Sequence, residues 1–530
     1  MLVVTERVDE IDPADRAIGV PRRTVLQGIA AAGAVAGTGA LWASPAVAAP
    51  SAPGGPPDWA AFDRSVGSAF DRMNLVGAAV AVVTGDRVLH TLTNGSRQLS
   101  PRRPVTENTG VLVASTTKPM TATMVAGYVD EGKLAWDQPV VDAWSGFRAP
   151  TDQLTRTLKV RDLLNMWSGI GRDEAKDFHV NGMTAADVIR GIVNYPVLGP
   201  PHTTYFYNND VYALGGYLPL LASGVALNDL GDAYAHTMRD RLFGPAGMTR
   251  AVVASDPRGV VDDYATGYGF DLRPKATSMP FASNGGAAPA GAVIASLQDM
   301  AAFARLQLRQ GVSVTGARVA SAAALAECWT AGSNQTVPPG TGDFVASGYG
   351  LGFSVDTLRD GTRVVWHNGA LDGFTSYVGF LPEKDLGLVV LTNMNVFPTG
   401  SIFYAYVLNL LLDQRFGYNP GLAEKVLEVS DAGLANLAQL GRQARPVDPR
   451  VVEPFLGYYE HDYTLVRDGG RLRLLVGPRR LTLAAMPDGS YRVSDGLLPG
   501  NRVNLTLDQD GHRRLELVDF ETVRLLNPAS

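Results

Sequence analysis

The amino-acid sequence predicts an α/β protein of the α+β type, in which an antiparallel sheet is flanked by helices and followed by a small C-terminal all-β barrel. Two observations carry this prediction. Residues 58–131 contain a helical pattern, a hairpin pattern and a second helical pattern, an order typical of an antiparallel sheet covered by helices. Beyond residue 450 the chain changes to short alternating runs separated by turn residues, which predicts successive antiparallel strands.

Helical and strand patterns follow one another from residue 58 onward. The runs 77–83 and 88–92 flank the Gly85-Asp86 turn and predict a hairpin whose first strand is buried on both faces. Residues 205–217, rich in tyrosine and asparagine, favour a loop with aromatic anchors. The other expected elements are helices at 58–73, 115–131, 158–164, 293–310 and 422–440, and a second hairpin made of 375–381 and 386–391.

The composition is that of a globular protein with room for one large and one smaller domain. The 530 residues are 46% hydrophobic and 18% charged, with a formal net charge of −6, and this mild acidity argues against a nucleic-acid partner. Cys328 is the only cysteine, which excludes an intrachain disulfide and a cysteine-based zinc site. Because the histidines are scattered without a His-x-x-x-His pair, we expect no metal and no cofactor.

The first 48 residues predict an export signal. Arg22 and Arg23 precede an apolar stretch rich in Ala and Gly at 25–43, and Ala46-Val47-Ala48 offers a small-x-small cleavage site. Paired arginines before a mildly apolar stretch are typical of twin-arginine export. An uncleaved membrane anchor is the alternative, because the apolar stretch is nearly long enough to span a bilayer. We expect a secreted or extracytoplasmic protein without stable membrane insertion after cleavage, in which 49–57 form a Pro/Gly-rich linker.

Ser115 and Lys118 are the first candidate catalytic pair. They stand three residues apart at the start of a helical pattern, so both side chains would lie on one helix face. A helix N-terminus favours developing negative charge, and a lysine nearby lowers the cost of deprotonating a serine. An N-cap serine beside a solvated lysine is the alternative for this pair taken alone.

Three motifs follow one another along the chain: Ser115-x-x-Lys118, Tyr207-x-Asn209 and His367-x-Gly369. With their flanks they resemble the serine β-lactamase and penicillin-recognising superfamily, nearest its class C-like esterases, D-aminopeptidases and DD-peptidases. The resemblance covers about residues 58–415. The matching flanks include 113–114, 157–164, 168–169, 214–215, 242–248, 289–291, 349–353 and 373–374.

The resemblance implies a serine hydrolase that forms an acyl-enzyme on Ser115, in a sheet domain that also has an all-helical part. Lys118 and Tyr207 would share the role of base, since a phenol beside a cationic amine loses its proton more readily. Asn209 would hold an amide or ester side arm of the substrate. The backbone N–H groups of Ser115 and Ala370 would form the oxyanion hole.

The resemblance also bears on the substrate. His367, which we count with the catalytic residues, stands where β-lactamases carry the lysine of Lys-Thr-Gly, beside the substrate-binding Gly369 and Ala370. A neutral histidine is a weaker clamp for a carboxylate than a lysine. We therefore expect slow β-lactam hydrolysis and a preference for small esters or for D-amino-acid amides or peptides, with cell-wall peptides among the candidate substrates.

Two other functions stay open. The histidine that the family usually carries before Ser168-Gly169 is replaced by Met166, followed by the bulky Trp167, and this departure favours a catalytically silent cell-wall-binding or sensor module. A true class C β-lactamase or DD-carboxypeptidase is the other alternative. An α/β-hydrolase is excluded, because the chain has no Gly-x-Ser-x-Gly motif.

These inferences divide the chain into a main domain at 58–415, a helical linker at 416–450 and a β-barrel domain at 451–530. The barrel resembles the lipocalin-like domains appended to some class C-like members. Residues 446–449, with the sequence Pro-Val-Asp-Pro, should be exposed and open to limited proteolysis. The strands expected in the barrel are 463–466, 471–476, 481–485, 490–493, 502–507, 513–517 and 522–526.

Overall fold

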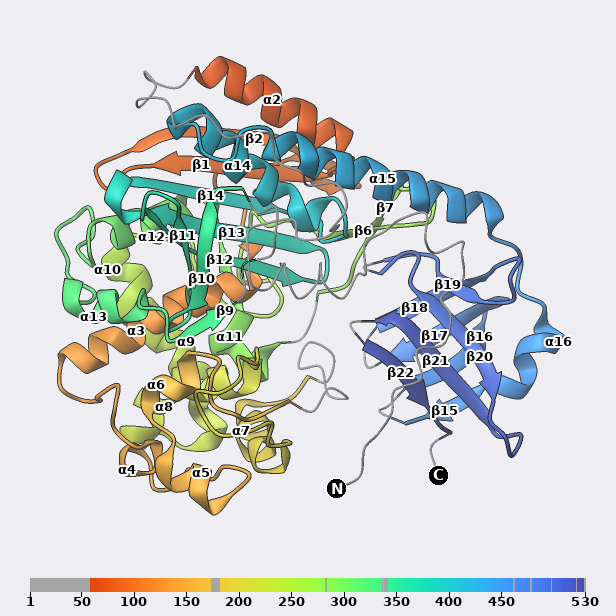
Figure 1. Cartoon of the computed structure of the whole chain (residues 1–530), viewed down its shortest axis with the longest axis horizontal. Helices are drawn as coiled ribbons and strands as arrows, with labels where there is room; N and C mark the ends of the chain where they lie inside the picture. Colours follow the sequence, from red (N-terminus) through yellow and green to blue (C-terminus); the bar gives the residue numbers. More distant parts are fainter. Residues whose placement is uncertain are drawn as a thin grey trace.

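A helix-covered sheet and a smaller barrel make up the computed structural model (Figure 1). The structure describes residues 58–172, 182–281, 284–335, 337, 342–460, 463–476, 479–496, 498–520 and 522–528. The expected signal peptide and the Pro/Gly-rich linker lie outside the described residues. The α+β architecture with a C-terminal barrel agrees with the expectation from the sequence.

The main sheet has nine antiparallel strands in the order β3–β2–β1–β14–β13–β12–β11–β10–β9. The hairpin that comes first in the sequence therefore lies beside the strands that end the domain, and Val80 of β1 pairs with Val390 of β14. The strands are β1 (Gly77–Val83), β2 (Val88–Leu99), β3 (Arg102–Pro104), β9 (Ser333–Gln335), β10 (Phe344–Tyr349), β11 (Ser354–Leu358), β12 (Arg363–Leu371), β13 (Phe374–Leu381) and β14 (Leu386–Thr392).

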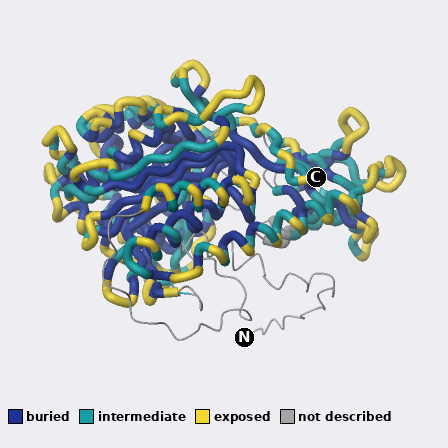
Figure 2. Tube along the Cα trace, turned by 90° about the horizontal axis from the view of Figure 1, so that it is seen from above, coloured by how far each residue is buried: buried dark blue, intermediate teal, exposed yellow. Residues whose placement is uncertain are grey.

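Helices cover both faces of this sheet and bury its central strands (Figure 2). Every residue of β1 is buried, as expected, because alternate residues enter separate hydrophobic clusters on the two faces. One cluster includes α3 (Thr117–Asp130), α8 (Asn209–Ala222) and α12 (Leu297–Leu308), and the other includes α2 (Trp59–Arg72), α14 (Phe403–Phe416) and α15 (Leu422–Gln443).

Shorter helices extend the α3 side into the all-helical part of the domain (Figure 1). They are α4 (Val140–Ala143), α5 (Asp152–Thr157), α6 (Val160–Leu164), α7 (Ala185–Gly191), α9 (Leu230–Met238), α10 (Gly244–Ala246), α11 (Ala288–Gly291) and α13 (Ala322–Cys328). No single described helix is long and apolar enough to cross a membrane, although Asn209–Ala222 and Leu227–Ala246 satisfy that test together as a pair bent by 117°.

Two small sheets complete the domain. In one of them β4 (Val111–Leu112) and β5 (Val252–Val253) flank β8 (Val293–Ala295). In the other, β6 (Tyr268–Phe270) pairs with β7 (Ala276–Ser278), and Figure 1 shows this ribbon beneath α15 on the side of the barrel.

The C-terminal barrel is a simple meander in which each strand pairs with the next. A bridge between Tyr459 and Pro528 brings the two ends of the meander together, and Glu460 N donates to Asn527 O at 2.9 Å. After α16 (Pro449–Val452), the strands are β15 (Gly457–Tyr459), β16 (Tyr463–Asp468), β17 (Arg471–Val476), β18 (Arg479–Ala485), β19 (Tyr491–Val493), β20 (Arg502–Leu507), β21 (Arg513–Phe520) and β22 (Thr522–Leu526).

The sequence placed most elements correctly, but residues 205–217 are not the expected loop. They enter α8 at Asn209, after Asn208 caps the helix by accepting from Asp210 N and Val211 N. Two glycines inside this helix lowered its apparent helical character. They are needed for packing, because a Cβ on Gly216 would lie 2.4 Å from Pro289.

Candidate active site

The main chain changes direction sharply at the candidate nucleophile. After β4, Ala114 adopts a left-handed φ of 49° and begins a 3₁₀ turn, Ala114–Thr116, that leads into α3. A non-glycine residue in this region stores strain, and such residues occur preferentially at functional sites. The turn is held by Val113 O, which accepts from Thr116 Oγ1 at 2.8 Å and from Ser376 Oγ of β13 at 2.6 Å.

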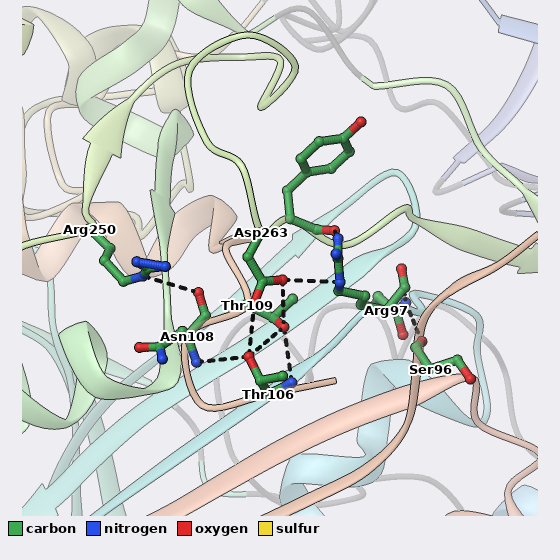
Figure 3. Close-up of polar contacts among 9 residues, drawn as sticks. Ser96, Arg97, Thr106, Asn108, Thr109, Arg250 and Asp263 are labelled. Carbon is green, nitrogen blue, oxygen red and sulfur yellow. Dashed lines mark hydrogen bonds and ion pairs between the residues drawn. The ribbon is translucent and has the colours of Figure 1, made fainter. Parts of the chain in front are cut away.

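A polar cluster holds the segment that enters β4 (Figure 3). The carboxylate of Asp263 accepts from Thr106 Oγ1 at 2.9 Å and Thr109 Oγ1 at 3.0 Å, and it pairs with Arg97 Nε at 3.1 Å. Arg97 also donates to Tyr264 O at 2.8 Å. Because Thr109 lies only a few residues before Ser115, this cluster fixes the strand that leads to the serine.

Ser115 lies between the two groups expected to activate it. Lys118 Nζ is 3.1 Å from Ser115 Oγ, and the Tyr207 phenol donates to the same oxygen at 2.9 Å. Lys118 Nζ also lies 4.7 Å from the centre of the Tyr207 ring. The structure therefore brings together three side chains from two segments that are far apart in the sequence.

Lys118 is fully buried and held by two obligate acceptors. Its Nζ donates to Asn209 Oδ1 at 2.7 Å and to Ala290 O at 2.8 Å. Burial lowers the pKa of Lys118 well below its usual range, because the ammonium form loses its hydration. In the neutral amine the two acceptors occupy both N–H groups, so the lone pair faces Ser115 Oγ. Lys118 can therefore accept the serine proton directly.

Tyr207 occupies the loop just before α8. Burial raises its pKa, against the hydrogen bond with Ser115 and the positive charge of Arg172, which both lower it. The phenol is therefore protonated and suited to donate a proton. The loop is tied down from the other side by Asn208, whose Nδ2 donates to Gly171 O at 2.8 Å.

Met166 stands at the place of the expected histidine and contacts this loop. Its buried Sδ accepts from Asn208 N at 3.3 Å, and its carbonyl accepts from Phe206 N at 2.9 Å. Met166 thus supports both neighbours of Tyr207.

His367 is buried on β12 and engaged on both ring nitrogens. Nδ1 lies 2.5 Å from Asn368 O, and Nε2 lies 3.0 Å from the Tyr349 hydroxyl. Because a carbonyl only accepts, Nδ1 carries the proton and Nε2 accepts from Tyr349. Burial lowers the pKa of His367 to about 3, and Lys118 lowers it further whenever the lysine is protonated. The imidazole is therefore neutral at physiological pH.

Gly369 lets β12 approach the nucleophile. A Cβ at this position would lie 2.1 Å from Val113 O and 3.0 Å from Ser115 N. Next to it, Ala370 is exposed and pairs with Thr375, one step from the Leu371–Phe374 pair that closes a two-residue turn. In a hairpin with a two-residue loop the closing pair is the hydrogen-bonded one, so this register directs the Ala370 N–H away from β13. Ser115 N lies in the first turn of its helix, where amides lack intrahelical partners.

Some site residues received no specific role from the sequence. Ala290 O holds Lys118, Tyr349 holds His367, and the Tyr212 hydroxyl donates to Lys118 O at 2.8 Å. Ala290 and Tyr349 lie within segments that matched family flanks, so the signal was present without indicating what each residue does. Arg172, whose guanidinium lies 5.9 Å from the Phe206 ring, had no such signal.

One group of potential metal ligands lies far from this site in the chain. Asp508, Asp510 and His512 occupy the β20–β21 turn, with ligand atoms within 4.8 Å of one another. Asp508 already caps that turn by accepting from the backbone N–H groups of Asp510 and His512. We assign it no function.

Comparison with known proteins identifies the family. The family model described as Beta-lactamase matches residues 62–409. Penicillin-binding protein 4 of Amycolatopsis lactamdurans is 29% identical over 73% of this chain and 93% of its own length. Unguisins hydrolase ungD' of Aspergillus campestris is 27% identical over 68% of this chain and 66% of its own.

Two further similarities extend the comparison. A D-aminopeptidase of Cereibacter sphaeroides is 27% identical over 63% of this chain, a match that spans 60% of the relative. The octameric penicillin-binding protein homologue from Pyrococcus abyssi has the same fold, with a TM-score of 0.57 and 21% identity, over 89% of this chain and all of its own. The chain belongs to the Beta-lactamase family and is a serine hydrolase.

Proposed function

We propose that this protein hydrolyses small esters, or amides and peptides of D-amino acids, through an acyl-enzyme on Ser115. The observation that carries the proposal is the position of Ser115 Oγ, 3.1 Å from Lys118 Nζ and 2.9 Å from the Tyr207 hydroxyl. A nucleophile between a buried amine and a protonated phenol has a base on one side and an acid on the other.

Acylation then follows from the protonation states. Lys118 takes the Ser115 proton while Oγ bonds to the substrate carbonyl carbon, and the resulting oxyanion accepts from the N–H groups of Ser115 and Ala370. As the tetrahedral intermediate collapses, the bond to the leaving group breaks and Tyr207 gives that group its proton. Lys118 returns the serine proton to Tyr207, which restores both groups. Asn209 holds the carbonyl of the substrate side arm through its amide nitrogen.

Deacylation reverses these roles with water. A water molecule on the acyl carbon loses its proton to the Lys118–Tyr207 pair as its oxygen bonds to the carbonyl carbon. The bond to Ser115 Oγ breaks, and the pair returns the proton to the serine. No further group is needed for either half of the reaction.

The neutral imidazole of His367 supports uncharged substrates. Penicillins and peptides ending in D-Ala present a carboxylate, which a cation at this position would bind. A charge-assisted hydrogen bond contributes about 1.5–3 kcal/mol, or roughly ten- to a hundredfold in affinity. Both ring nitrogens of His367 are already engaged by Asn368 O and Tyr349. Substrates lacking the carboxylate do not need this cation.

A catalytically silent cell-wall-binding module is the second candidate. It was favoured by Met166, but this residue supports Asn208 and Phe206 on either side of Tyr207. The complete set of Ser115, Lys118, Tyr207 and Asn209 supports turnover. A true class C β-lactamase or DD-carboxypeptidase is the third candidate and is opposed by the neutral His367.

A comparison of kcat/KM for four substrates separates these candidates. We expect a p-nitrophenyl ester and a D-alanine p-nitroanilide to be hydrolysed faster than nitrocefin or a D-Ala-D-Ala peptide. Nitrocefin turnover of about 10⁷ M⁻¹s⁻¹ or more would indicate a true β-lactamase. Absence of turnover on all four, with an unmodified Ser115, would indicate the silent module.

We also propose that the protein is exported by the twin-arginine route before it acts. Arg22, Arg23 and the small-residue site at 46–48 support this proposal. Replacing both arginines by lysine should leave the uncleaved precursor inside the cell, whereas the unchanged chain should be secreted and begin near residue 49. Secretion of the double-lysine variant at the normal level would contradict the proposal.

A further inference from the structure

A largely buried ion pair joins the barrel to the sheet domain. Arg479 of β18 donates from Nε and Nη2 to the two carboxylate oxygens of Asp372, at 2.8 and 2.7 Å. The two side chains are 15% and 4% exposed. This paired geometry matches the guanidinium fork to the carboxylate and fixes direction as well as distance.

Asp372 is placed where it can affect the site. It forms the β12–β13 turn with Gly373 and stands two residues after Ala370, whose amide is assigned to the oxyanion hole. The pairing of β12 with β11 runs from Arg363 to Trp366. Beyond Trp366, the described part of the main sheet contributes only β13 as a neighbour of β12. The main domain holds this hairpin end through Asn395 Nδ2, which donates to Leu371 O at 3.0 Å, and the Arg479 fork holds its turn from the barrel side.

A second connection joins the same turn to the barrel through β6. Tyr268 N donates to Gly373 O at 3.3 Å, and Phe270 N donates to Gly496 O of the barrel at 3.0 Å. A Cβ on Gly269 would lie 2.0 Å from Gly496 O, so the two backbones are in direct contact. Figure 1 shows the β6–β7 ribbon on the barrel side of the main sheet.

We propose that Arg479 is a positioning residue for the oxyanion hole, so that the barrel is part of the catalytic unit. This inference rests on the proposed acyl-enzyme chemistry. Arg479 touches no reacting atom. It acts by fixing Asp372, and through the turn it fixes the direction of the Ala370 N–H. A shift of this donor weakens binding of the tetrahedral oxyanion more than binding of the planar ground state.

Substitutions on one strand test the proposal. Arg479→Met removes the fork, Arg479→Lys keeps the charge without its paired geometry, and Arg480→Met changes the exposed neighbour as a control. Because Arg479→Met leaves the buried Asp372 unpaired and can impair folding, Arg479→Met combined with Asp372→Asn provides a second variant without that charge. Thermal melting identifies which variants fold.

The readouts are kcat and KM for a p-nitrophenyl ester and the affinity of a boronic acid, whose tetrahedral adduct mimics the intermediate. Removing an oxyanion donor outright costs about 10²–10³-fold in kcat, so displacing one should cost about tenfold. We expect Arg479→Met to lower kcat and boronate affinity by the same factor, with KM changed less than about twofold. Arg479→Lys should recover part of both losses, and Arg480→Met should behave like the unchanged protein.

Hydrogen exchange provides a readout that does not depend on turnover. Peptides covering 367–374 should exchange faster in Arg479→Met and in the double variant, but not in Arg480→Met. If a fluorophosphonate probe does not label Ser115 in the protein without substitutions, the proposed function is contradicted. The exchange result still decides whether Arg479 holds the hairpin. If the unchanged protein is labelled and folded Arg479 variants match Arg480→Met in kcat, boronate affinity and exchange, the positioning role alone is wrong.

Discussion

The two large sheets of this protein are assembled in opposite ways. In the barrel each strand pairs with its neighbour in sequence, from β15 to β22. In the main sheet β1 pairs with β14, so that Ala79 lies opposite Leu391. The barrel is built from local contacts, whereas the main sheet requires the two ends of its domain to meet.

The candidate site depends on the second kind of assembly. Ser115, Tyr207 and Gly369 come from three separate stretches of chain, and Ser115 N would lie 3.0 Å from a Cβ added to Gly369. The side chains of such a site are closely packed, so moving one of them also moves the others. We therefore expect changes in the main domain to alter catalysis directly, and changes inside the barrel core to alter stability first.

Lys118→Met should have the largest effect on catalysis. It removes the base, and loss of a general base costs about 10²–10⁴-fold in rate. The variant also leaves Asn209 Oδ1 and Ala290 O without their donor, which should lower the free energy of unfolding by about 1–3 kcal/mol. Steady-state kinetics with thermal melting measure both, and a folded variant with a kcat within tenfold of the unchanged protein would contradict the assignment.

Gly369→Ala should be the next most severe change. The new Cβ would lie 2.1 Å from Val113 O, so β12 must move away from Ser115. We expect about a hundredfold loss of kcat/KM, in the range of a misplaced catalytic group. Gly231→Ala is the matched control, because a Cβ there meets nothing within 4 Å. If both variants retain full activity, the close approach of β12 is unimportant.

Leu474→Ala tests the barrel side of the comparison. Leu474 is fully buried in the barrel cluster, and such truncations cost about 2–5 kcal/mol of stability. We expect a lower melting temperature with kcat/KM unchanged well below it, because the docking contacts of Arg479 and Gly496 are retained. A tenfold loss of kcat/KM at temperatures where the variant is folded would show that the barrel core, and not only its docking residues, acts on the site.

The last prediction concerns the pH dependence of kcat/KM in the protein without substitutions. Lys118 can act as a base only in its neutral form. The kcat/KM for an uncharged ester should therefore be highest above the pKa of Lys118 and should fall as the pH drops through that pKa. Because burial lowers the pKa of Lys118, the acidic fall of kcat/KM should have its midpoint well below pH 10.5. His367, with a pKa of about 3, should add no ionisation near neutral pH. A limb near 10.5 would mean that Lys118 is hydrated and charged in the resting enzyme.

The same contrast explains how much the sequence could predict. The strands of the barrel alternate with a two-residue period, and the first hairpin begins with a continuous apolar run before a Gly-Asp turn. Each of these strands pairs with an adjacent run, so pattern alone located them. Helix α8 was missed because Gly215 and Gly216 weaken the helical signal. The two glycines are needed because α6, α3 and α11 pack against them. The sequence does not show that these helices are neighbours of α8.

For the candidate site, the order of the motifs identified the residues but not their protonation states. The sequence placed Lys118 and Tyr207 together as a shared base, with a cationic amine assisting the phenol. Full burial instead favours a neutral Lys118 amine and a protonated Tyr207 phenol. The Arg479–Asp372 pair had no sequence signal, because domain docking depends on surfaces that no local pattern records.

The central claim is that Ser115 is the nucleophile, and covalent labelling tests it most directly. The mature protein is treated with a fluorophosphonate probe, digested and mapped by mass spectrometry, with Ser115→Ala as the control. We predict one adduct on the peptide containing Ser115, absent from a Ser115→Ala variant that melts at the same temperature. No adduct on Ser115, or an adduct elsewhere that persists in Ser115→Ala, would contradict this account.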